Sequence, residues 1–263
     1  MLYLNKFVGD TYQRNNKKEI IEMDTIKLDS GKVKMIAHRG LSGLEKENTN
    51  AAFVAAGNRA KYFGIETDVH VTADKGIIVI HDDNTSRVST DDLNVESSSY
   101  ETLRKIRLLD IDGSRGRSDL LLPSLEEYVG ICKKYEKYCI LELKNPMDPE
   151  DVYGIVETIK AMGYLEHVVF ISFALSNLVA LRERYPQQSA MYLIGKEWKD
   201  EVYGDLEKYN LDLDIDYRIL TKDIVDRVHA MGHTVNVWTV NDEESGLRMV
   251  EMGVDYITTN ILE

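Results

Sequence analysis

The sequence predicts a TIM (β/α)8 barrel, an α/β fold, with a small insertion subdomain after its second strand. Three observations lead to this prediction. Short β-branched runs alternate with helical patterns over most of the 263 residues, strand followed by helix is typical of a parallel sheet covered by helices, and about eight such units in about 250 residues is the size of this barrel. We expect residues 33–263 to form the barrel and residues 1–32 to form an irregular or helical segment below it.

Nine apolar runs are strand candidates, one more than the barrel needs. In chain order they are KVKMIAH, FGIETDVHV, GIIVIHD, YCILELK, VVFISF, SAMYLI, LDLDID, TVNVWTV and VDYITT. Only TADKG separates the second run from the third, whereas a parallel crossover needs about ten residues or more. We therefore expect an antiparallel hairpin that turns at 73–76 and places His81 opposite Asp68.

Helical patterns with capping residues follow most of the runs. They are NTNAAFVAAGNRAKYF, SLEEYVGICKKYEK, DPEDVYGIVETIKAMG, SNLVALRERYP and LTKDIVDRVHAMG. Ser124, followed by acidic residues, is typical of a helix start, and a glycine closes two of the patterns. These patterns predict helices on the outside of the barrel.

The stretch from 83 to 120 is polar and too long for an ordinary loop. It is predicted to be the inserted subdomain, with one short helix near 99–107, lying over one side of the site. It carries no second acid/base constellation, so we expect it to shape the pocket and not to take part in the chemistry.

Composition limits the partners. The chain has 45 acidic and 32 basic residues, a formal net charge of −13, which repels nucleic-acid backbones and anionic membranes. We expect a small-molecule substrate, no nucleic acid, no stable membrane anchor and a cytoplasmic location, while the oligomeric state stays open. Cys132 and Cys139 are too few for a disulfide framework and are expected to be free.

Charged and titratable side chains gather where several strands end, which is the edge at which TIM barrels place their active sites. Spacing of two residues puts pairs of them on one strand face. Alone, each would more commonly be a cap, a surface ion pair or a structural side chain. Burying all of them together without compensation would cost several kcal/mol each, and a bound metal ion supplies that compensation. The residues are His38, Arg39, Glu66, Asp68, His81, Glu142 and Lys144.

The residue types suggest their roles. Glu66, Asp68 and Glu142 offer only oxygen donors, which favour Mg²⁺ or Ca²⁺, and also Mn²⁺, over zinc. The two cations would hold an anionic, phosphate-bearing substrate. The two histidines would exchange protons near neutral pH.

Other polar residues have simpler interpretations. His70 is expected to be a solvated hairpin residue. The carboxylates of LDLDID could form a second metal site, but a strand with a polar face is favoured. Trp238, considered alone, is expected to belong to the core.

A set of short motifs runs through the chain: HRG at 38–40, ENT at 47–49, IETDV at 65–69, VIHDD at 79–83, PSLEE at 123–127, LELK at 141–144, ISF at 171–173, VNVWTVND at 235–242 and GVDYITTN at 253–260. In order and spacing this set resembles the glycerophosphodiester phosphodiesterase family, of the phospholipase C-like phosphodiesterase superfamily. The resemblance covers about 33–260. The chain departs from it at Asn260, where the family usually has an aspartate.

The resemblance implies a barrel with an insertion between HDD and PSLEE, and a divalent cation on the three carboxylates. It implies an acid/base pair formed by the two histidines and phosphate binding by Arg39 and Lys144. Glu47 matches a residue near the catalytic centre, and Trp238 matches an aromatic wall of the pocket.

The expected function is metal-dependent hydrolysis of glycerophosphodiesters, such as glycerophosphocholine or glycerophosphoethanolamine, to sn-glycerol 3-phosphate and an alcohol. His38 is expected to be the base and His81 the acid. The alternatives are a lysophospholipase D or sphingomyelinase D-like phosphodiesterase, and a barrel that binds phosphodiesters without turnover. Attack by water and attack through a cyclic phosphate both remain open.

Overall fold

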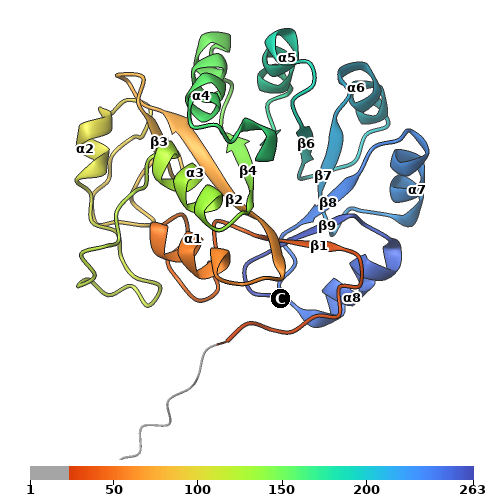
Figure 1. Ribbon diagram of the computed structural model, residues 1–263, viewed down its shortest axis with the longest axis horizontal. Coiled ribbons are helices and arrows are strands. Elements are labelled where there is room, and N and C mark those ends of the chain that lie inside the picture. The colour runs from red at the N-terminus through yellow and green to blue at the C-terminus, as the bar shows by residue number, and fades with distance from the viewer. Residues whose placement is uncertain (1–23) are drawn as a thin grey trace, which may run out of the picture.

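Eight parallel strands close into a barrel in the computed structural model, which describes residues 24–263 (Figure 1). The strand order is β1-β9-β8-β7-β6-β5-β4-β2, and β1 also pairs with β2, so the sheet has no open edge within the barrel. The predicted fold class is therefore confirmed. The strands are β1 Lys34–Ala37, β2 Tyr62–Val71, β4 Tyr138–Leu143, β5 Val168–Ser172, β6 Ala190–Ile194, β7 Asp212–Asp216, β8 Val235–Trp238 and β9 Tyr256–Thr259.

Helices surround this barrel, and capping residues begin several of them. Ser124 forms a capping box with Glu127, while Thr221 and Asp242 cap two later helices. The helices are α1 Asn50–Gly57, α3 Leu125–Lys134, α4 Pro149–Ala161, α5 Leu175–Arg184, α6 Glu201–Tyr209, α7 Lys222–Ala230 and α8 Glu243–Met252, with a short 3₁₀ turn at Leu165–His167. Five of these were predicted from the sequence, and α6 and α8 were not.

Two apolar layers hold the barrel together. The larger cluster lies between strands and helices and includes Phe53, Tyr128 and Val237, all buried. A smaller cluster, which includes Ile140, Ile171 and Leu193, projects from the other face of the strands. Since side chains alternate along a strand, the residues above this smaller cluster project into the barrel mouth.

The surplus strand, β3 Ile77–Val79, pairs antiparallel with β2, as the short connection predicted. The register differs from the prediction by one residue. Val71 lies opposite Ile77, and the backbone N–H of Ile80 donates to the carbonyl of Asp68 at 3.1 Å. Asp68 therefore faces Ile80, and His81 follows just beyond the pair.

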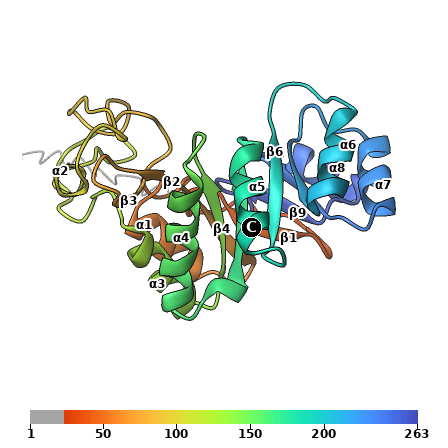
Figure 2. The same cartoon turned by 90° about the horizontal axis from the view of Figure 1, so that it is seen from above.

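The inserted segment 83–120 has an apolar cluster of its own. Figure 2 shows it standing to one side of the barrel, beyond β3. Its helix α2 spans Tyr100–Arg104, which is shorter than the predicted 99–107. The cluster contains Ile78, Ile80, Val88, Val95, Leu103, Ile106, Leu108, Leu120 and Leu122. The insertion is thus fastened to the barrel through the hairpin strand.

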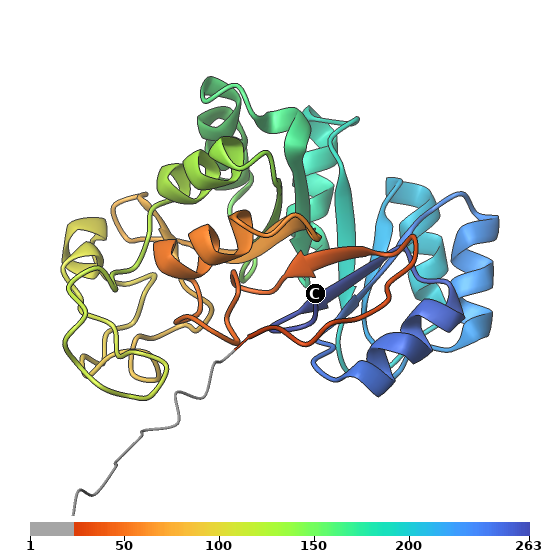
Figure 3. The same cartoon turned by 60° about the horizontal axis from the view of Figure 1, so that its bottom comes forward.

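The segment before β1 runs beside the chain's last residues and past α8 (Figure 3). Ile26 bridges Leu262, and the N–H of Leu28 donates to the carbonyl of Glu263 at 2.8 Å. The predicted segment 1–32 is irregular from residue 24 onward, and its earlier part lies outside the described residues. Cys132 and Cys139 are buried and free, as expected. Between residues 24 and 263 no helix has the length and apolar character needed to cross a bilayer.

Candidate active site

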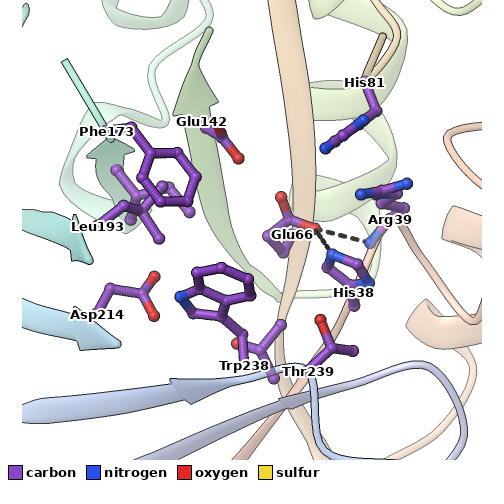
Figure 4. A pocket seen from close by; sticks show the side chains of 12 residues that line it. His38, Arg39, Glu66, His81, Glu142, Phe173, Leu193, Asp214, Trp238 and Thr239 are labelled. Atoms are coloured by element: carbon purple, nitrogen blue, oxygen red, sulfur yellow. Dashed lines mark hydrogen bonds and ion pairs between the residues drawn. The ribbon is translucent and has the colours of Figure 1, made fainter. Parts of the chain in front are cut away.

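A cavity of about 80 Å³ opens at the carboxyl ends of the strands. Six of the nine predicted site residues line it: His38, Arg39, Glu66, His81, Glu142 and Trp238. Figure 4 shows their side chains converging from both sides of the barrel mouth. Asp68, Lys144 and Glu47, the other three, contact residues that line it.

Three buried carboxylates form the most concentrated charge of the site. Oxygens of Glu66, Asp68 and Glu142 lie within 4.8 Å of one another. Parallel pairing of β2 with β4 sets Asp68 directly beside Glu142, and Glu66 lies two positions earlier on the same strand face. The sequence spacing therefore predicted this cluster correctly.

The surroundings shift the pKa values of the three carboxyl groups in different directions. Burial and then the neighbouring Asp68 raise the pKa of Glu142 to about 8, and burial with both neighbours raises the pKa of Glu66 well above its usual range. Asp68 is also buried, but Arg39 and Lys144 hold its pKa below the usual range. Burial and mutual repulsion thus disfavour the charged forms of Glu66 and Glu142, and an added cation would favour them.

Both predicted cations touch this cluster. Nζ of Lys144 lies 2.8 Å from Glu142 and 3.6 Å from Asp68, while Nε of Arg39 lies 3.5 Å from Asp68. Nη1 of Arg39 pairs with Glu47 at 2.8 Å. Nε of Arg39 is buried and has no hydrogen-bond partner among residues 24–263, so donor capacity is left over for a bound anion.

The turn after β1 holds Arg39 in a left-handed conformation, with φ of 55°, and Gly40 follows at φ of 76°. A side chain at Gly40 would place its Cβ only 2.6 Å from the backbone of Ala52 in α1. The N–H of Arg39 donates to Oε2 of Glu66 at 2.8 Å. Glycine is required here because the chain reverses against a helix, and the reversal directs two functional side chains into one cavity.

His38 is held by a residue that the motif comparison marked only as a departure. Its Nδ1 lies 2.7 Å from Oδ1 of Asn260, and its Nε2 lies 3.9 Å from Oε2 of Glu66. Burial and the adjacent Arg39 guanidinium lower the pKa of His38 to about 4. The neutral imidazole, which can accept a proton, is therefore the favoured form of His38.

His81 is held by its neighbour in the chain. Its Nδ1 lies 2.6 Å from Oδ1 of Asp82. Burial lowers the pKa of His81, while Asp68 opposes the shift and Arg39 and Lys144 reinforce it. The Nδ1 contact leaves Nε2 as the ring nitrogen available to a substrate.

Arg87, from the inserted segment, joins the two halves of the site. It makes two contacts of 2.8 Å to Glu47 and contacts Asp82 at 2.6 and 3.1 Å. Glu47 in turn holds Arg39, and Asp82 holds His81. The insertion thus does more than shape a pocket, because one of its side chains supports residues on both sides of the cavity.

Sequence reasoning missed several supporting residues. Nδ2 of Asn48 donates to Oδ2 of Asp68 at 2.8 Å, with Asn48 at a left-handed φ of 53°. Asn48 and Asp82 both lie inside recognised motifs, ENT and VIHDD, and that position was the available signal for them. No comparable signal marked Arg87, while Asp214 was noticed only as one of the LDLDID carboxylates and was assigned to a polar strand face.

Aromatic and apolar side chains form the opposite wall of the cavity. Phe173 and Trp238 meet edge to face with ring centroids 5.6 Å apart. Ile171 and Leu193 also line the cavity and belong to the apolar cluster against which Trp238 packs. Trp238 is thus part of the pocket wall, as the resemblance implied, and not simply a core residue.

Two expectations about other polar residues can now be compared with the structure. The prediction that His70 is solvated was wrong, because its side chain is fully buried and its Nδ1 lies 2.9 Å from Oε1 of Glu96 in the insertion. The carboxylates of β7 have separate partners: Asp212 accepts from the N–H of Thr234, Asp214 from Asn236 and Asp216 from Arg218. Within residues 24–263 the only close trio of potential metal ligands is Glu66, Asp68 and Glu142.

Comparisons with known proteins agree with this site. A family model described as the glycerophosphoryl diester phosphodiesterase family matches residues 38–263. The chain is 28% identical over 236 residues to a glycerophosphodiester phosphodiesterase of Bacillus altitudinis, covering 86% of this chain and 94% of the relative. It is 25% identical over 262 residues to human lysophospholipase D GDPD1, covering 86% and 83% of the two chains.

Solved structures share the fold. A glycerophosphodiester phosphodiesterase from Parabacteroides distasonis superimposes with a TM-score of 0.71 at 28% identity, covering 87% of this chain and 93% of that one. A phosphodiesterase from Oleispira antarctica, solved in complex with the product sn-glycerol-3-phosphate, gives 0.78 at 24% identity, covering 89% and 96%. Since the family model spans most of the chain, this protein belongs to the glycerophosphoryl diester phosphodiesterase family.

Proposed function

We propose that the enzyme hydrolyses small glycerophosphodiesters, such as glycerophosphocholine and glycerophosphoethanolamine, to sn-glycerol 3-phosphate and an alcohol, and that it needs a divalent cation. The observation that carries the proposal is the meeting of three buried carboxylates, two imidazoles and two cations at one barrel mouth. The name of the Bacillus altitudinis relative supports the reaction class.

The carboxylate trio fits a divalent cation such as Mg²⁺ or Ca²⁺. All donors are oxygens, which these hard ions prefer. Burial and then repulsion from the neighbouring carboxylates raise the pKa values of Glu66 and Glu142, and a cation beside them would favour their charged forms. When bound, such a cation polarises a phosphate oxygen and offsets charge that develops during the reaction.

The protein's own residues supply the grip and the proton transfers. Arg39 and Lys144 bind and orient the phosphate, Arg39 through its planar fork of donors. Nε2 of His38, unprotonated in the neutral ring, accepts a proton from the attacking hydroxyl or water. His81 donates a proton to the oxygen of the leaving alcohol, so that the alcohol departs neutral.

The test is choline release from glycerophosphocholine, with and without EDTA, followed by addition of Mg²⁺ or Ca²⁺. We expect EDTA to abolish release, either ion to restore it, and Glu66→Gln to lose both activity and bound metal measured by elemental analysis. Glu207→Gln on α6, far from the site, is the matched control. Full activity in excess EDTA would overturn the metal requirement, and no release from any glycerophosphodiester with metal present would overturn the function.

A further inference from the structure

One buried carboxyl group of the cavity has no part in the mechanism. Asp214, in the middle of β7, lines the same cavity as the two histidines and is only 1% exposed. Figure 4 shows its carboxyl group pointing into the cavity from the side opposite Glu66 and Arg39. It is therefore placed to meet whatever part of the substrate extends away from the phosphate.

Asp214 is poorly compensated by the protein. Its Oδ1 accepts a hydrogen bond of 2.7 Å from Nδ2 of Asn236, which Thr258 orients in turn. No Lys, Arg or His lies within ion-pair distance of Asp214 in the described part of the chain, and its Oδ2 has no hydrogen-bond donor there. Burial raises the pKa of Asp214 to about 8. Burial thus favours its neutral carboxylic acid form, which can both donate and accept a hydrogen bond.

The surroundings of Asp214 suit a short carbon chain that ends in a hydroxyl group. Phe173 and Trp238 form one wall, and the buried side chains of Ile171, Leu193 and Thr258 close the floor. Nε1 of Trp238 is buried without a hydrogen-bond partner in residues 24–263, and its edge of the indole faces Asp214 in Figure 4. This part of the cavity, the Asp214 lobe, is defined here by Ile171, Phe173, Leu193, Asp214, Trp238 and Thr258.

We propose that the Asp214 lobe recognises the free terminal hydroxyl of the glyceryl group and excludes diesters in which that hydroxyl is acylated. This inference rests on the proposed function and narrows its substrate class to deacylated glycerophosphodiesters, as opposed to lysophospholipids. A hydroxyl group is matched by Asp214 in both donor and acceptor capacity. An ester oxygen has no proton to donate, and its acyl chain would collide with the closed floor.

A positively charged headgroup is the competing occupant, and the geometry disfavours it. A cation binds best over the face of an aromatic ring, whereas Trp238 turns its N–H edge toward Asp214. The side of the site formed by His81 and Arg87 is more open to solvent, because their side chains are 34% and 45% exposed. The glyceryl group therefore takes the closed lobe and the leaving alcohol takes the open side.

The experiment compares kcat/KM for four choline-type substrates in the metal-loaded enzyme. They are glycerophosphocholine, its analogue without the terminal hydroxyl, lysophosphatidylcholine, and the neutral 3,3-dimethylbutyl isostere of glycerophosphocholine. We expect the wild type to prefer glycerophosphocholine over the deoxy analogue by about 10- to 100-fold, because the analogue leaves a buried polar group unpaired. The kcat/KM for lysophosphatidylcholine should be at least as low as that for the deoxy analogue. The kcat/KM for the neutral isostere should be close to that for glycerophosphocholine.

Substitutions then assign the preference to Asp214. Asp214→Leu should bring the ratio of parent to deoxy analogue close to one, while Asp214→Asn should keep most of it, because an amide also donates and accepts. Asp216→Asn, buried on the same strand but paired with Arg218 outside the cavity, is the matched control and should keep the full ratio. An unchanged ratio in Asp214→Leu overturns the proposal, as does efficient hydrolysis of lysophosphatidylcholine by the wild type.

One alternative outcome and one fallback measurement complete the test. If Asp214→Leu changes only the preference for choline over its neutral isostere, the lobe binds the headgroup and the proposal is wrong. If Asp214→Leu does not fold, calorimetric binding of glycerol 3-phosphate and its terminal-deoxy analogue to the wild type and Asp214→Asn answers the question instead. Equal binding of both would overturn the lobe's role. Failure of the proposed function shows separately, as absence of turnover with every diester despite selective binding.

Discussion

Nδ1 of His38 lies 2.7 Å from the amide oxygen of Asn260, at the end of the closing strand of the barrel. The hydroxyl of Ser42 also donates to that oxygen, at 3.0 Å, and the backbone N–H of Asn260 donates to Asn241 at 2.8 Å. An amide oxygen only accepts, so the ring proton resides on Nδ1 and Nε2 keeps its lone pair. The departure of Asn260 from the family pattern thus lies in direct contact with the proposed base.

Replacing this amide by a carboxylate should change the pH dependence of the enzyme. In Asn260→Asp the negative charge favours the imidazolium form and raises the pKa of His38. Since the base must be neutral, the acid limb of kcat/KM should move upward by about one pH unit or more. Asn260→Ala should lose on the order of 10-fold in kcat with a smaller change in KM. An acid limb at the same pH in wild type and Asn260→Asp would contradict this assignment.

Arg87 should be indispensable although it lies in the insertion. Arg87→Ala would release both Glu47 and Asp82, and we expect about 10- to 100-fold loss in kcat, the usual effect of a misplaced catalytic group. Arg87→Lys should recover little of this, because a single ammonium cannot reproduce contacts to two carboxylates. Added guanidinium should partly restore Arg87→Ala.

The control for Arg87 is another arginine of the same segment. Arg117 pairs with Glu45 and Asp119 and does not line the cavity. Arg117→Ala should therefore keep kcat within about twofold of the wild type, because neither Arg117 nor its partners contact a residue of the cavity. Equal losses in the two variants would mean that the insertion acts only through its general stability.

The two histidines should differ in their dependence on the leaving group. His38→Ala and His81→Ala should each lose about 10²–10⁴-fold in kcat on glycerophosphocholine. A p-nitrophenyl ester needs little protonation as it leaves, so it should rescue His81→Ala and not His38→Ala. Rescue of His38→Ala instead would exchange the roles of acid and base, and near-normal kcat in both variants would make the pair structural.

Asp214 should impose its own pH dependence on stability. Its pKa is raised from 3.8 to about 8 by folding, so between these values the folded state binds a proton that the unfolded state releases. The free energy of unfolding therefore falls as pH rises, by about 1.4 kcal/mol per pH unit from this group alone. Asp214→Asn removes the effect. In urea unfolding, the free energy of unfolding of the variant relative to that of the wild type should therefore be higher at pH 7.5 than at pH 5. A constant difference between the two proteins would show that Asp214 is ionised when folded.

The sequence predicted the barrel and its carboxylate trio because both depend on local periodicity. Residues two apart share a strand face, and strand ends meet at one rim, so Glu66, Asp68 and Glu142 could be placed together without coordinates. The hairpin was predicted from the length of its connection, because TADKG is too short for a parallel crossover. The observed register differs from the predicted one by one residue, because the N–H of Thr72 donates to the carbonyl of Gly76 across the turn at 2.8 Å. Periodicity does not reveal the geometry of such a turn.

What the sequence could not show depends on contacts between distant segments. His70 is buried because Glu96, 26 residues later, reaches it from the insertion. Arg87 meets Glu47 across 40 residues, and Asn260 meets His38 across 222. Such pairs follow from how the insertion and the closing strand pack, and no spacing rule encodes them.

The separate apolar cluster of the insertion bears on how the enzyme fails when heated. The insertion packs around Ile78, Ile80 and Leu120 and does not share the main core, so it can open while the barrel stays folded. Opening would withdraw Arg87 from Asp82 and Glu47. Heat inactivation would then precede melting: catalysis would cease, reversibly, at a temperature where the circular dichroism of the barrel is still native. The apolar cluster of the insertion would thus set the working range of the enzyme.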